Sequence, residues 1–432
     1  MAQVALALQC GELLARMSCC ETNRQTYDWW TSMELDKDWE EGVCMHAAPF
    51  CGITFYKGDA PRQFLRKRWI EIVNTNPWLA GRLSKDPTST RVVLKVPPHP
   101  PHADRLCNEL GDVGIRPGMD YQELVKLCTA CTQVKTGQEA LEREQQLTQL
   151  AVTKAGKDHF AIILSICPVI VDGHNFYSIY HMLDPSVQLR PLDHSFVHFE
   201  AREEALQAIG MQKHAYSVDT RRSVFSQVAG LLKTDSSQKP LLRYVNEDFI
   251  TEQKKRHSSA SAVVPWVSTN DILTSWFVNA VHADYLTMKI SWRHRMGNLT
   301  EITAGNYEGV LHYWPSEADT PQKIRRSISS PPHYGGERRD VPTPLEELWQ
   351  CQAHVSNWGN FYRDVNLPES ELLNHVPILS DSAVTGFTMV IFKARAKQTA
   401  VYVYGRNRKL MAELANNRAL GANLLPGAIG GI

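Results

Sequence analysis

The chain has 432 residues, of which 43% are hydrophobic and 21% are charged, an ordinary globular composition with ample material for a core. Lysine plus arginine and aspartate plus glutamate both number 46, so the net charge gives no reason to expect a nucleic-acid partner or an anionic membrane. No run of about 18 apolar residues occurs, and we therefore expect no segment that spans a bilayer. The length suits two or three domains, or two large halves that are tightly joined.

The N-terminal stretch MAQVALALQCGELLARM is apolar, but it carries Glu12 and Arg16 and lacks a basic leading region, so a secretory signal is not expected. Ten cysteines are spaced irregularly, and nine of them precede residue 168. The single CxxC, formed by Cys128 and Cys131, has neither a second pair nor a nearby His-x3-His. Buried, reduced thiols explain it better than a zinc site, and we expect a cytoplasmic protein without a metal.

Helical and strand patterns alternate along the first half. Between residues 61 and 85, apolar side chains recur on one face of a helix, which ends at Asn76-Pro77 because a residue before proline leaves the helical region. Residues 91–96 have the composition of a strand, and a stiff, proline-rich connection follows at 97–101. Two further helices are expected at 138–149 and 174–183.

The second half repeats this mixture of strands and helices. Between about 187 and 240 the chain becomes polar with two helical segments, which predicts a crossover between halves. We therefore divide the chain into a first lobe (1–200), a crossover (201–262) and a second lobe (263–432). In the second lobe we expect, in order, a helix at 268–286 that Ser268 or Thr269 can cap, an exposed loop at 329–344, strands at 386–393 and 399–404, and a helix at 408–419.

The segment from His159 to Leu183 has the pattern of a functional site. Its apolar run, 160–166, predicts a strand that is buried on both faces and central in a sheet. Asp172 and Gly173 make the turn into the next helix, where ligands of open α/β sheets gather. His174 could serve there as a general base. The alternative is that Asp172 caps the helix or pairs with a buried arginine, while His174 lies at the surface.

This strand–turn–helix resembles the HxxxDG segment of the chloramphenicol acetyltransferase superfamily, which includes plant BAHD acyltransferases, fungal acetyltransferases and the condensation domains of peptide synthetases. Other segments resemble the superfamily in the same order. They are Asn76 to Leu83 (NP-x-L-x-G-R-L), Ser268 to Thr274 (the helix that opens the second domain), Ala304 to Gly309 (GN-x-x-G) and Val355 to Trp358 (the SW segment).

The resemblance implies an α/β fold of two chloramphenicol-acetyltransferase-like lobes, each a mixed sheet packed with helices, with a channel between them. An acyl-CoA thioester would enter from one side and an alcohol or amine from the other. The histidine of the motif takes the acceptor's proton, while its aspartate, here Asp172, is structural. The resemblance further implies substrate contacts at Gly305, Asn306, Ser356 and Trp358, no bound cofactor, and a monomer, which no heptad pattern opposes.

The chain departs from the superfamily at the residue that would act as the base. Four residues before Asp172 stands Pro168, which has neither an ionisable group nor an N–H. No other histidine in the chain has an aspartate four residues on, and the BAHD sequence DFGWG is missing after Trp358. Asp172 and Gly173 are intact.

Two neighbours could replace the missing base. His174 is one. The other is Cys167, which we expect on the opposite side of the strand from residue 168, as a buried thiol. Three hypotheses follow: an acyltransferase that is slow or has a relocated base, a non-catalytic protein that binds an apolar small molecule in the channel, and a pseudoenzyme that binds a protein partner.

Overall fold

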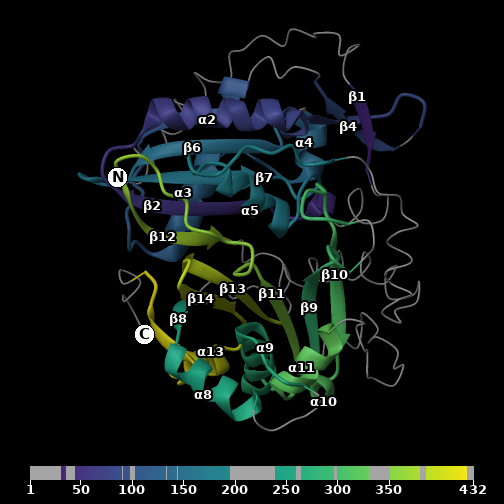
Figure 1. The fold of residues 1–432 in the computed structure, drawn as a ribbon, viewed down its shortest axis with the longest axis vertical. Helices are drawn as coiled ribbons and strands as arrows, with labels where there is room; N and C mark the ends of the chain where they lie inside the picture. Colours follow the sequence, from purple (N-terminus) through teal and green to yellow (C-terminus); the bar gives the residue numbers. More distant parts are fainter. Residues whose placement is uncertain are drawn as a thin grey trace.

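The computed structural model describes residues 31–35, 44–89, 91–97, 103–132, 134–143, 145–194, 239–258, 264–295, 299–329, 351–379 and 386–425. Figure 1 shows two lobes, one above the other, each built of a β-sheet and helices. The expected α/β class and two-lobed arrangement are therefore confirmed. One cluster of buried apolar side chains fills the first lobe and extends to one face of β13 and β14, and a second cluster lies between the other face of the second sheet and its helices.

The first lobe contains a five-stranded mixed sheet in the order β12-β2-β7-β6-β5 and a three-stranded antiparallel sheet in the order β1-β4-β3. The strands are β1 (Thr31–Glu34), β2 (Phe50–Lys57), β3 (Arg82–Lys85), β4 (Val92–Val96), β5 (Cys107–Asp112), β6 (Thr148–Lys154), β7 (His159–Ile166) and β12 (Glu371–Ile378). The helices are α2 (Arg62–Thr75), α3 (Tyr121–Thr132), α4 (Gly137–Arg143) and α5 (Gly173–His181).

Strand β7 is the third of the five strands, and every residue from Phe160 to Ile166 is buried. The expected central strand is thus confirmed. Because β7 pairs with β2 on one side and β6 on the other, both of its edges are hydrogen-bonded. Its C-terminal end consequently has a fixed position, from which the turn into α5 leaves.

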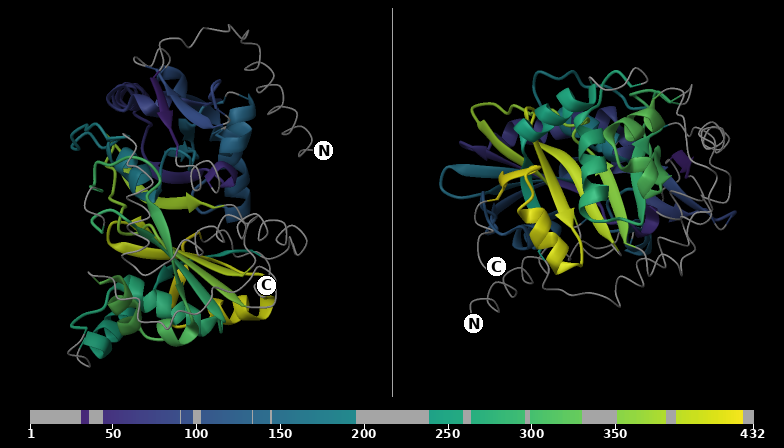
Figure 2. Two further views of the ribbon diagram at one scale, coloured as in Figure 1. Left: turned by 90° about the vertical axis from the view of Figure 1, so that its right-hand side faces the viewer. Right: turned by 90° about the horizontal axis from the view of Figure 1, so that it is seen from below.

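The second lobe contains a seven-stranded mixed sheet in the order β10-β9-β11-β13-β14-β8-β15. The strands are β8 (Leu241–Val245), β9 (Tyr285–Ser291), β10 (Glu308–Tyr313), β11 (Gln352–Asn357), β13 (Phe387–Arg395), β14 (Gln398–Tyr404) and β15 (Leu420–Asn423). The helices are α8 (Glu247–Ser258), α9 (Thr269–Ala280), α10 (Pro315–Ala318), α11 (Pro321–Ile328) and α13 (Arg408–Ala415). In Figures 1 and 2 these helices lie on the side of the sheet that is away from the first lobe.

Two segments join the lobes in a way that the linear division at 200 and 262 does not describe. Strand β12 belongs to the C-terminal third of the chain but pairs antiparallel with β2 in the first sheet. Strand β8 and helix α8 lie within 201–262, and β8 pairs with β14 in the second sheet. The positions of the lobe boundaries themselves stay a prediction.

Three expected helices are shorter than the sequence pattern indicated. The helix expected at 268–286 ends at Ala280, because His282 has a positive φ of 51° and β9 begins at Tyr285. At its start Ser268 accepts a hydrogen bond from the amide of Asp271, as a capping residue does. The helix expected at 138–149 is α4, after which β6 begins, and the helix expected at 408–419 is α13.

The expected helical segments of 200–230 and most of the loop at 329–344 lie outside the described residues. Among the helices that are described, none is long and apolar enough to cross a membrane. The described residues also contain no group of three or more His, Cys, Asp or Glu side chains that could hold a metal ion. Cys128 and Cys131 both lie on α3, and Cys128 is fully buried.

Candidate active site

The residues between β7 and α5 form a buried turn at the boundary of the two lobes. The strand ends at Ile166, and the amide of Ile170 donates to the carbonyl of Cys167 at 3.2 Å. Residues 168–170 are therefore not strand, so strand alternation does not apply to Cys167 and Pro168, and their placement on opposite sides stays a prediction. Cys167 has no solvent exposure, and burial raises the pKa of its thiol to about 12, so it is a poor nucleophile.

Pro168 is buried, and the second lobe reaches its backbone. The side-chain amide of Asn306 donates to the carbonyls of Pro168 (3.2 Å) and Val171 (3.3 Å). Asn306 therefore holds the turn from the opposite lobe through two of its backbone carbonyl groups. Its expected contact with substrate stays a prediction. The proline ring places no proton acceptor at this position.

Asp172 both caps α5 and pairs with a buried arginine. It accepts a hydrogen bond from the amide of Asn175 at 2.9 Å and another from the amide of Tyr307 at 3.1 Å. Its second oxygen also forms an ion pair with Arg293, and both side chains are almost completely buried. The carboxylate therefore has a structural part in joining the lobes, as the alternative interpretation of the motif expected.

Arg293 is the centre of this inter-lobe network. Its guanidinium donates to the carbonyl of Thr303 at 2.8 Å and to the side-chain oxygen of Asn175 at 2.7 Å. That same oxygen of Asn175 accepts from the amide of Gly305 at 3.1 Å. Gly305, three residues before β10, has a φ of 127°, a backbone conformation that favours glycine. Arg293 lies two residues beyond the end of β9, and no sequence pattern had indicated it.

Gly173 marks the other contact between the motif and the second lobe. Its amide lies 3.4 Å from a carboxylate oxygen of Glu308, and the second oxygen of Glu308 pairs with Lys289 at 2.8 Å. A Cβ on Gly173 would lie 3.7 Å from Glu308 and 3.8 Å from the ring of Phe361. Glu308 is mostly buried, and nothing in the motif pattern had indicated it.

His174, the proposed substitute base, lies beside the turn and is half-buried. Its ring meets that of Phe361 edge-on, with 5.5 Å between centroids. Its Nδ1 is buried, and no hydrogen-bond partner for it is found in the described part of the chain. Burial, and then the charge of Arg293, lower the pKa of His174 to about 4. The imidazole is thus neutral at pH 7, and its role as a base stays a prediction.

Ser356 and Trp358 come to the same region from β11. The indole nitrogen of Trp358 donates to the hydroxyl of Ser356 at 3.0 Å. The indole ring packs near Phe50, with 5.6 Å between centroids, and near Tyr177 of α5, at 6.4 Å. The SW segment thus meets the helix that follows Gly173, although a substrate contact at either residue stays a prediction.

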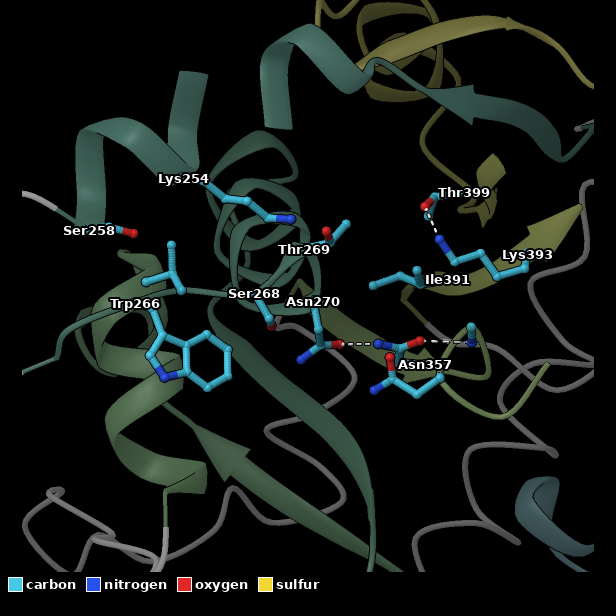
Figure 3. A pocket seen from close by; sticks show the side chains of 13 residues that line it. Lys254, Ser258, Trp266, Ser268, Thr269, Asn270, Asn357, Ile391, Lys393 and Thr399 are labelled. Atoms are coloured by element: carbon cyan, nitrogen blue, oxygen red, sulfur yellow. Dashed lines mark hydrogen bonds between the residues drawn. The ribbon is translucent and has the colours of Figure 1, made fainter. Parts of the chain in front are cut away.

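A pocket of about 440 Å³ opens in the second lobe, at the N-terminus of α9 (Figure 3). It is lined by Lys254, Ser258, Trp266, Val267, Ser268, Thr269, Asn270, Asn357, Gly359, Asn360, Ile391, Lys393 and Thr399. Pro168, Asp172 and His174 do not line it. Asn357 and Gly359, however, flank Trp358, so the pocket and α5 lie on opposite sides of one loop. Four of its lining residues belong to the segments 268–274 and 355–358 that resemble the superfamily, but the sequence pattern did not predict a pocket between them.

Two amines face the pocket without a carboxylate in its lining. Lys393 donates to the hydroxyl of Thr399 at 2.8 Å, and Figure 3 shows Lys254 across the opening. Burial lowers the pKa of Lys393, the charge of Glu247 raises it, and the charge of Lys254 lowers it. Two ammonium groups at one pocket suit an anionic ligand such as a phosphate.

The fold and the inter-lobe network define a protein of the chloramphenicol acetyltransferase-like fold class. The chain resembles TRI101 of F. sporotrichioides, solved in complex with coenzyme A and T-2, with a TM-score of 0.61 and 12% identity over 90% of this chain and 97% of that chain. TRI101 of F. graminearum, complexed with ethyl coenzyme A, gives a TM-score of 0.60 and 11% identity over 90% and 98%. The first condensation domain of the CDA synthetase gives 0.54 and 13% over 91% and 98%.

No family model and no curated protein sequence matches the chain. At 11–13% identity, the solved structures establish the fold of this protein and not its reaction. They do confirm the fold class that the sequence motifs had indicated.

Proposed function

We propose that the protein transfers an acyl group from a CoA-type thioester to a hydroxyl or amine, with the nucleotide of the thioester in the pocket beside α9. The pair of lysines without a lining carboxylate carries this proposal. Coenzyme A is a polyanion, and two ammonium groups match its phosphates. Trp266 is 53% exposed at the pocket, where an adenine could stack on its indole.

The position of the pocket supports the same proposal. The loop 357–361 separates it from α5, and Phe361 of that loop touches both Gly173 and His174. A nucleotide held at the pocket would therefore place a flexible thioester arm within reach of the inter-lobe boundary. The partners are then a small-molecule acyl donor and acceptor, without a bound cofactor, and we propose a monomer that acts in the cytoplasm.

Calorimetric titration with coenzyme A tests the pocket. Because a hydrogen bond to a charged group contributes about 1.5–3 kcal/mol, Lys254→Ala and Lys393→Met are each expected to raise the Kd by about tenfold or more. The matched control is Lys255→Ala, a neighbour on α8 that does not line the pocket. An unchanged Kd in both pocket variants would refute this ligand site.

Pro168 favours a second candidate, a non-catalytic protein that binds an apolar small molecule or a protein partner at the same boundary. A general base contributes about 10²- to 10⁴-fold to a transfer rate, and the proline supplies none. Release of free coenzyme A from acetyl-CoA separates the candidates when wild type is compared with Pro168→His. A silent wild type and an active variant would support the binding protein, whereas equal rates indicate that another residue is the base.

A further inference from the structure

We propose that His354 on β11 is the general base of this transfer, in place of the imidazole that Pro168 lacks. The inference rests on the proposed acyl transfer. It is carried by the face of the second sheet on which His354 lies, by the hydrogen bond that orients its ring, and by the polar contacts that connect this face to Gly173.

Strands β9 and β11 present two different faces. Leu286, Met288 and Val355 belong to the apolar core of the second lobe, beneath the helices. Because side chains alternate along a strand, Thr287, Lys289 and His354 lie on the opposite face. Figure 1 shows that face turned toward the first lobe. On β9 and β11 this face is therefore polar, whereas on β13 and β14 it carries apolar residues such as Phe392 and Tyr402 that pack with the first lobe.

The ring of His354 is oriented by its neighbour on β9. Thr287 and His354 are partners in the parallel register of β9 and β11, and the threonine hydroxyl is hydrogen-bonded to Nδ1 of the imidazole. When Nδ1 carries the proton and donates it to Thr287, Nε2 presents a lone pair. Among the described residues, no side chain or backbone group is hydrogen-bonded to Nε2, and the side chain is only half-buried. An oriented, reachable imidazole is what a general base requires.

A continuous set of contacts joins this surface to the motif. Lys289, two residues beyond Thr287 on the same face, pairs with Glu308, and Glu308 contacts the amide of Gly173. Ser356, two residues beyond His354, accepts a hydrogen bond from Trp358, whose ring packs near Tyr177 of α5. His354 thus shares a sheet face with Lys289 and Ser356, whose contacts reach Gly173 and α5.

The imidazole of His354 is neutral at pH 7, chiefly because of burial. Burial, and then the ammonium group of Lys289, lower the pKa of His354 to about 4. His312 on β10 is a register partner of Thr287 and is hydrogen-bonded to Tyr285, while Thr388 on β13 is the uncharged register partner of His354. At pH 7 the ring is therefore in the neutral form, in which one nitrogen can accept a proton.

The other candidates are less accessible. His375 is fully buried, and both of its ring nitrogens are engaged, Nδ1 with Thr54 at 2.9 Å and Nε2 with Tyr177 at 3.0 Å. Cys167 is also fully buried. Among the described residues, no group is hydrogen-bonded to Nδ1 of His174, so its ring lacks the orienting partner that His354 has. His354 combines an oriented ring with an accessible nitrogen.

In the proposed step, Nε2 of His354 removes the proton of the acceptor hydroxyl as its oxygen attacks the thioester carbonyl. The carbon–oxygen bond forms, the carbon–sulfur bond breaks, and the departing thiolate takes the proton back from the imidazolium. The products are the acyl ester and free coenzyme A, and the imidazole is neutral again. With water as the acceptor, the product is the free acid.

Hydrolysis of acetyl-CoA, followed as free coenzyme A, tests this assignment with the full chain. His354→Gln is expected to lower kcat by about 10²- to 10⁴-fold while the Kd for coenzyme A stays unchanged. Thr287→Val should lower kcat less and move the acidic limb of the pH–rate profile, since the ring loses its orienting partner. His312→Gln removes the neighbouring imidazole of the same face as a matched control and should keep the wild-type rate.

Added imidazole should restore part of the rate to His354→Ala, a result that a purely structural role would not give. A wild-type rate in His354→Gln would overturn the assignment. So would a wild type that binds coenzyme A but releases none from acetyl-CoA, although the ligand pocket would then still stand. A wild type that does not bind coenzyme A would refute the proposed function itself.

Discussion

Replacing Arg293 with methionine is expected to lower the free energy of unfolding by about 3–5 kcal/mol, because Asp172 would then be buried without its counterion. The loss also removes one of the donors to the carbonyl of Thr303 and one of the donors to the side-chain oxygen of Asn175. Urea unfolding followed by tryptophan fluorescence measures the change. Since the network joins the two lobes, we expect the unfolding of both lobes to shift.

The matched control is Arg418→Met, which removes a solvent-exposed ion pair with Glu252 and should cost no more than about 1 kcal/mol. Adding Asp172→Asn to Arg293→Met should recover part of the lost stability, because the uncompensated charge is then gone. Equal losses in Arg293→Met and Arg418→Met would show that the buried pair is not what holds the lobes together.

Acid is expected to destabilise the protein through His375. Burial, and then the nearby His181, lower the pKa of His375 from 6.5 to about 3. Below pH 6.5 the unfolded chain binds a proton that the folded chain takes up only near pH 3. The stabilisation is therefore fully present above pH 6.5 and is lost as the pH falls, by about 2 kcal/mol at pH 5 and about 4 kcal/mol at pH 3.

Urea unfolding of wild type and His375→Gln at pH 7 and pH 5 measures how much the free energy of unfolding of each protein changes between the two pH values. The variant has lower stability at pH 7, because Thr54 and Tyr177 lose a partner, but its stability should fall less between the two pH values. His282→Gln, at an exposed position, should follow the wild-type slope. Parallel curves for wild type and His375→Gln would contradict the prediction.

The sequence predicted those parts of the fold that depend on local patterns. The apolar run of 160–166 identified β7 as a central strand, and Ser268 with Asp271 marked the start of α9. Helix ends were less well predicted, as at Ala280, because residues such as Tyr285 and Leu286 suit either a helix or a buried strand. The motifs also located the turn at Pro168. That a proline there has no ionisable group follows from the sequence alone.

The parts of the site that were missed come from distant strands. Arg293 and Glu308 are 121 and 135 residues from their partners in the motif, and only the pairing of β9 with β10 brings them there. No sequence pattern indicated His354, because its proposed role depends on which face of β11 turns toward the first lobe. The pocket likewise combines α8, α9 and β13, whose proximity no local spacing could show.

A crystal structure of the full chain soaked with coenzyme A would locate the ligand itself. We expect the phosphates between Lys254 and Lys393, the adenine near Trp266, and the thiol arm passing the loop 357–361 toward Gly173. Coenzyme A bound elsewhere, or a pocket that stays without density at saturating ligand, would contradict this expectation.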